Sequence, residues 1–406
     1  MMGTNVLPQI RFADFTKELD YSQFRFDEIF DFSTGKNIKQ SEAAPEFKTP
    51  CVRYGELYHL YGEVITKVVN KTNLAHSELT FSQGNEVLLP SAGEDPLDIG
   101  SASALTLDNV AIGRTINVLR PKGTVPYSHV YVSFYINEKL KKKISTLARG
   151  ASISNVYNSD LKGLKITLPS IDEQNKIADF LSAVDKKISL LKEKHALLEQ
   201  YKKGVMQKLF KREIRFKDDD GSEFPDWQET KLGTWLEEYK EKSQIENQYE
   251  VLTSSRKGLI KQSDYYGEGR ITERKNLGFN VIPSGFLTYR SRSDDRQFFF
   301  NKNDLGFTGI ISTYYPVFTM KNKQNDFFVE LTRMHKNKFG RQAVGTSQVV
   351  LSFNELKNIK LPMPSSKEQE KITNFSLELD TKLRLLKEQI ELIQTFKKGL
   401  MQKMFV

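Results

Sequence analysis

The chain has 406 residues, more than one hydrophobic core usually serves, so at least two domains are expected. Hydrophobic residues make up 38% of the chain and aromatic residues 11%, which indicates folded domains rather than disorder, and no apolar run is long enough to predict a membrane span. The net charge of +9 weakly favours a nucleic-acid partner, and the single cysteine, Cys51, excludes internal disulfides and indicates a cytoplasmic protein.

The first predicted unit, residues 1–168, is an N-terminal arm followed by a domain of ordinary size. Strand-like runs at 87–90, 115–121 and 131–136 alternate with turns, and the run NEKLKKKIST at 137–146 predicts a helix near the end of the domain. This mixture of strands and short helices is typical of an α+β fold.

A long helix is predicted next, over residues 169–211. It begins directly after the LPS sequence at 168–170, where the proline suits a helix entry. Apolar residues then recur at alternating spacings of four and three residues, which is the pattern of a coiled-coil seam. A helix with one such stripe needs a partner to cover it.

A second domain and a second long helix complete the chain, over residues 212–363 and 364–406. The second domain has strand-like runs at 285–292 and 314–320 and a predicted helix at 326–340. The order and spacing of these elements agree with those of the first domain, although the two sequences differ. Either two modules of different specificity or drift after a duplication explains this difference.

An internal repeat sets the architecture. Residues 150–210 align with residues 345–405 at a constant offset of 195 residues, without a gap. The match is closest at the ends, KKGVMQKLF at 202–210 and KKGLMQKMF at 397–405. The chain is therefore a duplication in which two divergent domains alternate with two repeated helices.

The two helices are expected to pair with each other as a coiled coil. A parallel pair is physically possible, but the duplication favours an antiparallel pair, because a pseudo-two-fold axis then buries equivalent surfaces in both halves. The predicted seam consists of Ile177, Leu181, Val184, Ile188, Leu191, His195, Leu198, Lys202, Val205 and Leu209 in the first helix and of Ile372, Ser376, Leu379, Leu383, Leu386, Ile390, Ile393, Lys397, Leu400 and Met404 in the second.

The repeated endings pose two further questions. Lys202 and Lys397 fall on the seam, so the apolar contact between the helices is expected to open there. Gly204 and Gly399 each cost about 1 kcal/mol relative to alanine inside a helix, which indicates either close approach by another element or a frayed end. The MQK-[LM]-F sequence that follows packs either on a neighbouring domain or on a partner protein.

The duplicated motifs resemble those of the specificity subunit of type I restriction–modification systems. The resemblance rests on LPS-x-x-EQ-x-KI at 168–177, LPMPSSKEQEKI at 361–372, the two KKG-[VL]-MQK-[LM]-F endings and PDWQETKLG at 225–233. It covers essentially the whole chain, and its specificity comes from the occurrence of the motifs in duplicate.

The resemblance implies two target recognition domains separated by two long antiparallel helices. Each domain would read one half of a split site in double-stranded DNA, and the helices would act as spacer and as docking surface for two modification subunits. Methylation, translocation and cleavage would belong to modification and restriction subunits, so S-adenosylmethionine, ATP and Mg are expected only in those partners. No catalytic or metal-binding residue is expected in this chain.

A self-contained DNA-modifying or DNA-cleaving enzyme is the alternative. Against it, the sequence has no phosphate-binding GxxxxGK[ST] loop, no motif of amino-methyltransferases, and five scattered histidines. Asp226 and Glu229, with Lys231, are residue types of magnesium-dependent nucleases, but they are too closely spaced, and Trp227 as a packing anchor is the structural alternative. A scaffold without nucleic acid is a third possibility, which the two matched domains oppose.

The strongest candidates for DNA contact lie in the second domain. On a strand, Arg290 and Arg292 share one face, and arginine pairs with guanine or clamps phosphate; neutralisation by Asp294 and Asp295 is the alternative. Basic and aromatic residues of a neighbouring loop suit DNA contact, with an ordinary solvated loop as the alternative. The further candidates of these two clusters are Arg296, Arg256, Lys257, Lys261, Tyr265, Tyr266 and Arg270.

Weaker candidates lie in the first domain and before each repeated segment. Arg149 and Arg341 precede the repeated segments and either touch backbone phosphate or act as struts between domains. The candidates in turns and loops of the first domain are Lys36, Arg53, Tyr54, Ser91 and Ser128.

Overall fold

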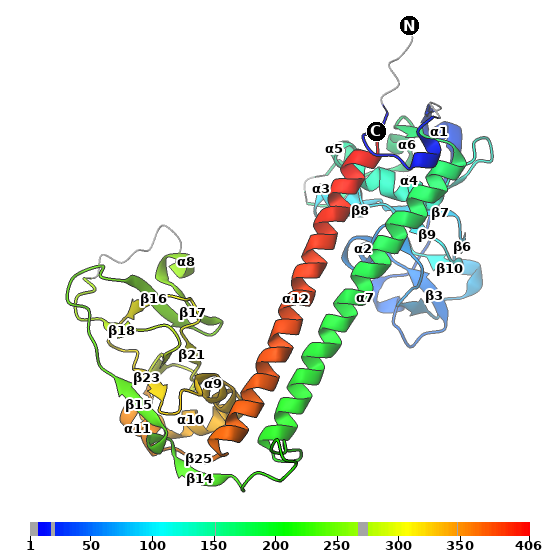
Figure 1. Cartoon of the computed structure of the whole chain (residues 1–406). Coiled ribbons are helices and arrows are strands. Elements are labelled where there is room, and N and C mark those ends of the chain that lie inside the picture. Colours follow the sequence, from blue (N-terminus) through cyan, green and yellow to red (C-terminus); the bar gives the residue numbers. More distant parts are fainter. Residues whose placement is uncertain (1–6, 18–20, 151, 267–274, 347) are drawn as a thin grey trace. The chain divides into compact units, whose positions relative to one another are not determined.

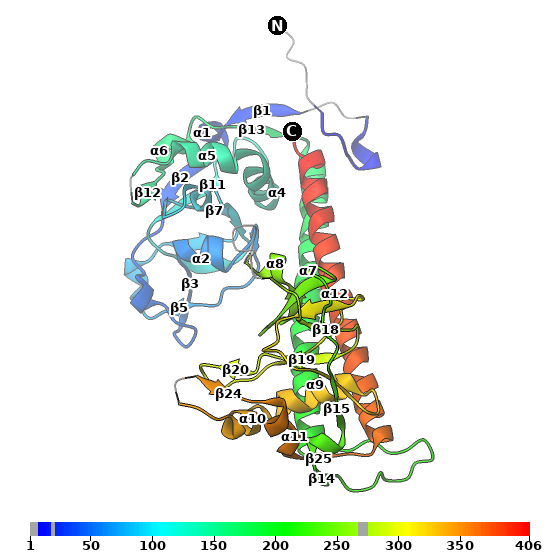
Figure 2. The ribbon, with the colours of Figure 1, turned by 90° about the vertical axis from the view of Figure 1, so that its left-hand side faces the viewer.

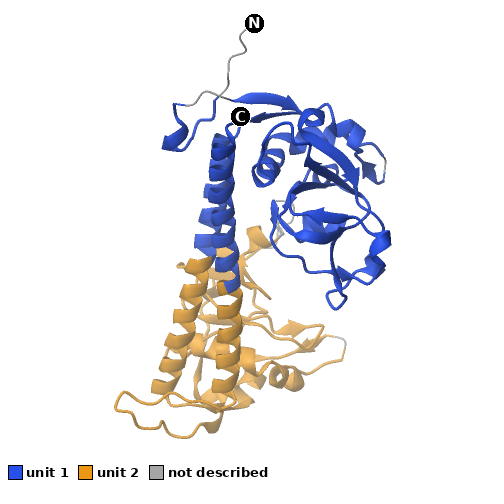
Figure 3. Cartoon of the chain, turned by 90° about the vertical axis from the view of Figure 1, so that its right-hand side faces the viewer, with its two compact units in different colours: residues 1–193, 387–406 blue, residues 194–386 orange. Residues whose placement is uncertain are grey.

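The protein is described by a computed structural model with two compact units. Unit 1 comprises Met1–Glu193 and Lys387–Val406, and unit 2 comprises Lys194–Leu386 (Figure 3). Each unit therefore contains one domain and about half of each long helix. The structure describes residues 7–17, 21–150, 152–266, 275–346 and 348–406.

The first domain is a mixture of short strands and short helices. Its strands are β1 (Ser22–Arg25), β2 (Phe30–Thr34), β3 (Thr49–Val52), β4 (Val64–Ile65), β5 (Lys71–Thr72), β6 (Phe81–Gln83), β7 (Glu86–Pro90), β8 (Ala92–Gly93), β9 (Ser103–Leu105), β10 (Asp108–Ile112), β11 (Ile116–Pro121), β12 (Ser154–Asn155) and β13 (Lys165–Leu168). Its helices are α1 (Phe26–Ile29), α2 (Tyr54–His59), α3 (Pro96–Ile99), α4 (His129–Tyr135), α5 (Lys141–Leu147) and α6 (Asn158–Leu161).

Two sheets and two ribbons organise these strands (Figure 2). The larger sheet has the order β2–β11–β7–β9–β4, and the smaller has the order β5–β3–β10–β6, with β10 parallel to β3 and antiparallel to β6. The ribbons pair β1 with β13 and β8 with β12. On β7, Val87 and Leu89 join the core around α4, whereas Leu88 faces a second core on the other side of the sheet, so both faces of this strand are covered.

One predicted strand is wrong: residues 131–136 form α4 and the turn that follows it. The hydroxyl of Ser128 caps this helix by accepting a hydrogen bond from the backbone nitrogen of Tyr131 at 3.4 Å. All five residues from Tyr131 to Tyr135 are buried, so no polar face marks the helix in the sequence. Its aromatic and β-branched residues favour a strand locally, and packing on all sides overrides that preference.

The second domain follows the same plan with different residues. Its strands are β14 (Gln228–Lys231), β15 (Leu236–Tyr239), β16 (Glu250–Ser255), β17 (Gly258–Lys261), β18 (Asn280–Ile282), β19 (Leu287–Tyr289), β20 (Arg292–Ser293), β21 (Phe300–Lys302), β22 (Gly309–Ile311), β23 (Val317–Met320), β24 (Val349–Val350) and β25 (Lys360–Met363). Its helices are α8 (Gln262–Tyr266), α9 (Asn325–Met334), α10 (Lys336–Gln342) and α11 (Phe353–Asn358).

The sheets of the second domain confirm the duplication. Their orders are β15–β23–β19–β21 and β17–β16–β22–β18, and β22 is parallel to β16 and antiparallel to β18, as β10 is to β3 and β6. Ribbons β14–β25 and β20–β24 match the two ribbons of the first domain. The α+β fold with a pseudo-two-fold plan is therefore the one predicted from the sequence.

The long helices are α7 (Ile171–Phe210) and α12 (Ser366–Met404), and they run antiparallel, as predicted (Figure 1). In unit 1, Lys397 of α12 lies 2.8 Å from Asp185 of α7, and in unit 2, Lys202 of α7 lies 2.6 Å from Asp380 of α12. Every residue of the predicted seam is buried or half-buried. Among the described residues, neither these helices nor any other is long and apolar enough to cross a membrane.

Candidate nucleic-acid interface

Two exposed arginines follow strand β19 and open strand β20. Arg290 and Arg292 are exposed, whereas Ser291 and Ser293 are buried, as expected of an extended segment. The hydroxyl of Ser291 donates a hydrogen bond to the backbone oxygen of Tyr314 at 2.6 Å, and the guanidinium of Arg292 lies 4.4 Å from the centre of the Tyr314 ring. The serines hold the segment in place and leave both arginines at the surface.

The two neighbouring carboxylates, Asp294 and Asp295, contact side chains other than Arg290 and Arg292. Asp295 accepts a hydrogen bond from Ser293 at 2.9 Å and pairs with Arg256 at 2.6 Å, and Asp294 accepts one from Gln348 at 2.9 Å. The hydrogen bond from Ser293 is the main reason that the pKa of Asp295 lies below its usual range. Within the described part of the chain, the two exposed arginines have no ion-pair partner, so internal neutralisation does not explain this cluster.

Arg296, the third arginine of the cluster, holds its own loop together. Its residue adopts a left-handed conformation with φ of +60°, and its guanidinium donates hydrogen bonds to the backbone oxygens of Gly340 at 3.4 Å and Gly345 at 3.2 Å. A Cβ atom on Gly340 would lie 2.3 Å from the backbone oxygen of Arg296. These contacts tie the loop to α10 and give Arg296 a role inside the domain.

A second basic cluster surrounds a small cavity beside the turn between β16 and β17. Arg256 and Lys257 form the turn, and Arg333 and Lys336 reach the same cavity of about 100 Å³ from α9 and α10. The ring of Phe299 lies 5.4 Å from the guanidinium of Arg256 and 6.0 Å from the ammonium of Lys336. Four cations line this cavity, two of them beside the aromatic ring, although Arg256 also pairs with Asp295 and Arg333 with Glu330; the arrangement suits a phosphate group or a stacked base.

Sequence analysis did not identify Arg333 and Lys336 as candidates. They lie about 75 residues after the turn in a helical stretch with an ordinary polar face, and only the fold brings them to the turn. The basic residues of the helix at 326–340 were the only signal in the sequence, and a solvated helix face gives the same signal.

The structure gives few contacts for the remaining candidates of this loop. Lys261 is half-buried, with its ammonium 5.8 Å from the ring of Phe307, and Tyr265 on α8 is exposed. The side chain of Tyr266 and the whole of Arg270 lie outside the described residues. Their assignment to DNA contact stays a prediction.

The first domain offers two exposed candidates. Lys36 is exposed after β2, and Tyr54, the first residue of α2, is also exposed. Arg53 instead points toward Glu56, with its Nε 2.9 Å from the carboxylate, and Asn70 donates to the same carboxylate at 2.8 Å. Arg53 therefore stabilises the start of α2, and Lys36 and Tyr54 stay candidates for DNA contact.

The two predicted serines have structural roles. Ser91 lies between β7 and β8, and its backbone nitrogen donates to Thr115 at 2.9 Å while its backbone oxygen accepts from Val156 at 3.0 Å. Ser128 caps α4, and its backbone nitrogen donates to the side-chain oxygen of Gln174 at the start of α7, at 3.0 Å. Ser128 thus attaches the first domain to α7.

The arginines before the repeated segments are both exposed. The guanidinium of Arg149 lies 3.2 Å from Asp160, within the first domain, and Arg341 lies on α10 of the second. Since the side chain of Arg149 remains 79% exposed despite this pair, it is accessible to a phosphate group. The contact of Arg149 lies within the first domain, so it is not a strut between domains.

The motif at the start of α7 forms a buried node in unit 1. The carboxylate of Glu173 accepts two hydrogen bonds from Arg11 at 2.9 and 2.6 Å and one from the Tyr21 hydroxyl at 3.2 Å. Burial, followed by the charge of Glu173, raises the pKa of Tyr21, so this hydroxyl stays protonated and donates. The node fastens the N-terminal arm and the first domain to α7.

The start of α12 forms the matching node in unit 2. The carboxylate of Glu368 accepts hydrogen bonds from Arg215 at 3.1 and 2.9 Å and from the Trp227 indole at 3.0 Å. Trp227 is buried, whereas the side chain of Asp226 is 95% exposed, which supports the packing alternative for this sequence over a nuclease site. Among the described residues, no group of three histidine, cysteine, aspartate or glutamate side chains is placed to hold a metal ion.

The repeated endings pack into the domain cores. The end of α12 enters the core of the first domain, where the ring of Phe405 lies 5.2 Å from that of Tyr131 on α4. The end of α7 enters the core of the second domain, where the ring of Phe210 lies 5.8 Å from that of Phe327 on α9. This settles where the two MQK-[LM]-F sequences pack: each lies on a recognition domain.

Two matched domains on an antiparallel pair of repeated helices define a duplicated recognition protein. The chain belongs to the family of type I restriction–modification specificity subunits, because the family's sequence model, described as a type I restriction modification DNA specificity domain, matches residues 18–200 and 226–395. Like other members of this family, it recognises DNA sequence.

Individual relatives agree with this assignment. The specificity subunit of the type I restriction enzyme MjaVIII from Methanocaldococcus jannaschii is 25% identical over 304 residues, which cover 66% of this chain and 68% of the relative. The fold is similar to that of the S subunit of a type I system from M. genitalium, with a TM-score of 0.60, 18% identity and 99% of both chains covered. The HsdS subunit from Thermoanaerobacter tengcongensis has a TM-score of 0.50, at 14% identity, covering 95% of this chain and 96% of that one.

Proposed function

We propose that this chain recognises a split DNA target and directs partner subunits to it, without catalysing a reaction itself. The observation that carries the proposal is the repetition of one domain plan with two different surfaces, since two such domains on one chain suit two different half-sites. The second domain offers Arg290 and Arg292 for reading bases, and its cationic cavity offers a grip on the phosphate backbone. The first domain offers Lys36 and Tyr54.

The long helices supply the proposed docking surface for two modification subunits. Outside the seam, α7 and α12 carry exposed apolar rows: Leu190, Leu197 and Tyr201 on α7, and Leu385, Leu392 and Phe396 on α12. The members of the two rows correspond one to one at the repeat offset of 195 residues, and the spacing places each row on one face of its helix. Equivalent rows are suited to two copies of the same partner.

The chemistry is assigned to the partners. Methyl transfer from S-adenosylmethionine belongs to the modification subunits, and ATP-driven translocation and Mg-dependent cleavage belong to the restriction subunits. In this proposal the specificity subunit contributes affinity for one bipartite sequence and holds its partners there.

The test of function is a methylation map. The chain is expressed with its cognate modification subunit in a host without other DNA methylation, and the methylated bases are sequenced. We expect one bipartite motif, absent when either chain is omitted. Methylation or cleavage by the purified chain alone would instead support a self-contained enzyme, and methylation without a common motif would contradict sequence recognition.

The docking surface is tested by subunit stoichiometry. Replacing Leu197 and Tyr201 with lysine, or Leu392 and Phe396 with lysine, is expected to leave one modification subunit bound instead of two, because each pair of substitutions puts charge into one apolar row. Gln200→Lys on the exposed face of α7 is the matched control. Native mass spectrometry that finds two bound partners in both double variants would place the docking surface elsewhere.

A further inference from the structure

Each recognition domain is attached to the helices at a further point, besides its apolar core and the node at the start of α7 or α12. In unit 2, the ammonium of Lys202 lies 2.6 Å from Asp380 of α12 and 3.6 Å from Glu330 of α9. The side chain of Lys202 is only 13% exposed, and Glu330 is 10% exposed. One lysine therefore joins its own helix, the partner helix and the recognition domain.

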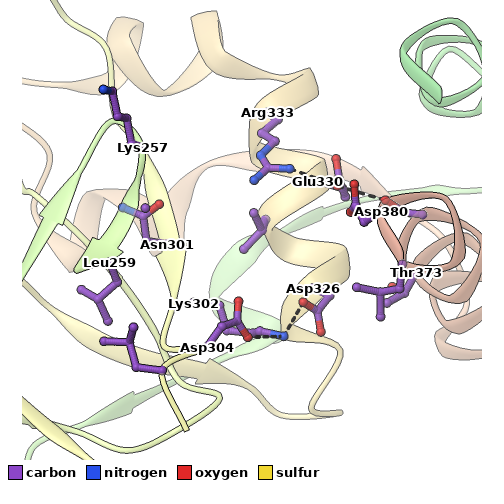
Figure 4. A pocket seen from close by; sticks show the side chains of 15 residues that line it. Lys257, Leu259, Asn301, Lys302, Asp304, Asp326, Glu330, Arg333, Thr373 and Asp380 are labelled. Atoms are coloured by element: carbon purple, nitrogen blue, oxygen red, sulfur yellow. Dashed lines mark hydrogen bonds and ion pairs between the residues drawn. The ribbon is translucent and has the colours of Figure 1, made fainter. Parts of the chain in front are cut away.

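Glu330 is itself firmly placed. Its carboxylate accepts hydrogen bonds from the hydroxyl of Ser376 on α12 and from the guanidinium of Arg333, both at 3.1 Å. It lies at the wall of a polar cavity of about 350 Å³ between α9, α12 and the sheet, where Figure 4 shows it between Arg333 and Asp380. The contact between the second domain and the helices is thus polar at this point.

The same arrangement occurs in unit 1, at the equivalent lysine. The ammonium of Lys397 lies 2.8 Å from Asp185 of α7, 3.2 Å from both carboxylate oxygens of Glu63, and 5.1 Å from the ring of Phe134 on α4. The backbone oxygen of Glu63 accepts hydrogen bonds from Ala104 and Ser133, so this residue is fixed within the first domain. Burial raises the pKa of Asp185, against the opposing hydrogen bond from Lys397.

The duplication explains only part of this match. The two lysines and the two aspartates correspond at the repeat offset of 195 residues, but Glu63 and Glu330 lie in divergent domains and do not correspond in sequence. In each domain a carboxylate therefore contacts the equivalent lysine, and the two carboxylates come from different elements. A charge that recurs from unrelated sequence indicates a shared requirement rather than inheritance alone.

The geometry relates each lysine to an anchor further along its helix. Lys202 precedes Phe210 by eight residues and Lys397 precedes Phe405 by eight residues, about 12 Å along an α-helix. In unit 2 both points touch α9, through Phe327 and Glu330, and in unit 1 both touch α4, through Tyr131 and Phe134. The nodes at the starts of α7 and α12 hold each domain at one end of the helix pair. The lysine adds a polar contact on the same domain helix that the phenylalanine touches, so the two contacts together resist rotation of that helix.

We propose that Lys202 and Lys397 are positioning residues for sequence recognition, each setting the angle at which its neighbouring domain meets DNA. The inference rests on the proposed function, since it assigns one lysine to each half-site. Neutralising Lys202 then degrades reading by the second domain alone, and neutralising Lys397 degrades reading by the first domain alone.

The test uses the full complex of this chain with its modification subunits. Lys202→Met and Lys397→Met remove the charge and keep the length of the side chain, and Lys203→Met and Lys398→Met, at the exposed neighbouring lysines, are matched controls. Methylation rates are measured on DNA that carries the correct target or a single mismatch in either half. We expect each seam variant to lose about tenfold in discrimination at one half-site, different for the two variants, and none at the other half-site.

Two further variants separate positioning from folding. Glu330→Gln and Glu63→Gln leave the ion pair between the helices intact, and each is expected to reproduce the half-site defect of its lysine without lowering the thermal stability of the helix pair. Equal loss at both half-sites, or unchanged discrimination in both seam variants, would overturn the inference. If the wild-type complex methylates no specific sequence, the proposed function fails instead, which is a distinguishable result.

Discussion

At the scale of single residues, the sequence predicted the exposure of side chains better than their contacts within the fold. The alternation of arginine and serine at 290–293 was readable because a strand has a period of two. Arg296 belongs to the same run, but its partners, Gly340 and Gly345, lie more than 40 residues away, so its structural role follows from the fold alone. Arg53 is different, because the Arg-x-x-Glu spacing to Glu56 is visible in the sequence.

Base readers and phosphate contacts are expected to respond differently to substitution. Arg290→Ala should cost about 1–3 kcal/mol of binding free energy and relax the methylated motif at one base pair, if its guanidinium reads a base edge. Lys336→Gln should weaken binding to all sequences equally and reduce the slope of log affinity against log salt by about 1, because one phosphate contact is lost.

The measurement for both variants is a binding titration at several salt concentrations combined with a methylation map. Lys338→Gln, on the same helix as Lys336, is the control. A changed methylated motif in Lys336→Gln would mean that Lys336 reads a base. An unchanged motif with a reduced salt slope in Arg290→Ala would mean that Arg290 contacts phosphate.

His335 is expected to make the second domain sensitive to acid. Burial, and to a smaller extent the charge of Lys338, lowers the pKa of this imidazole, and its Nε2 has no hydrogen-bond partner among the described residues. The unfolded chain therefore binds a proton at higher pH than the folded chain, so stability is fully present above the unfolded pKa of about 6.5 and falls as the pH decreases below it.

The pH effect is measured by thermal unfolding at pH 7.5 and 5.5. We expect the wild-type chain to lose more stability on acidification than His335→Leu, which cannot take up the proton. Equal losses in the two proteins would show that other groups dominate the acid response.

At the scale of elements, periodicity predicted the long helices well and the buried short helix poorly. The seam of α7 and α12 repeats over many turns. The other faces of both helices are exposed to water, so the pattern of apolar and polar residues is unambiguous. In α4 all residues from Tyr131 to Tyr135 are buried, and the same hydrophobic run is compatible with a strand. A long amphipathic helix thus carries its structure in the sequence, whereas a helix surrounded by core depends on its neighbours.

The two glycines of the repeated endings are expected to weaken the helices. Gly204 and Gly399 lie inside helices that continue to Phe210 and Met404, and an added Cβ atom would meet none of the described residues within 4 Å at either site. Close approach by another described element and a frayed end therefore do not explain the two glycines. Gly204→Ala and Gly399→Ala should each raise the free energy of unfolding by about 0.5–1 kcal/mol.

Chemical denaturation measures this gain. Gly221→Ala is the contrasting variant, because Gly221 has a φ of +84° and the substitution should destabilise the protein. If Gly204→Ala raises stability yet reduces binding of a modification subunit, the glycine serves close approach by that partner. A loss of stability in Gly204→Ala would contradict the expected effect.

At the scale of the whole molecule, the duplication was the feature most fully readable from sequence. An offset that stays at 195 residues through the motifs, the seam and the endings requires that the two halves fold alike. The domain surfaces were not readable in the same way, because the short stretches around Arg256 and Arg290 share only scattered residues with their counterparts in the first domain. Shared framework and divergent surface are encoded by different residues, and only the framework repeats.

The helices are expected to set the length of the unread gap between the half-sites. The two ion pairs define the midpoint of the helix pair, since residues 193–194 lie midway between Asp185 and Lys202 and residues 388–389 lie midway between Asp380 and Lys397. Four residues inserted after Glu193 and four after Glu388 leave both ion pairs and both domain attachments unchanged. Such an insertion adds about 6 Å of helix and about 40° of rotation.

Those increments correspond to a small change in the DNA site. One base pair turns DNA by about 35° and advances it by about 3.4 Å, so we expect the gap to lengthen by one or two base pairs while both half-site sequences stay the same. A variant with four exposed helix residues replaced rather than inserted controls for the change in sequence, and methylation maps of the variants provide the measurement. An unchanged gap in the insertion variant, with full methylation activity, would mean that the helices do not measure the distance between the half-sites.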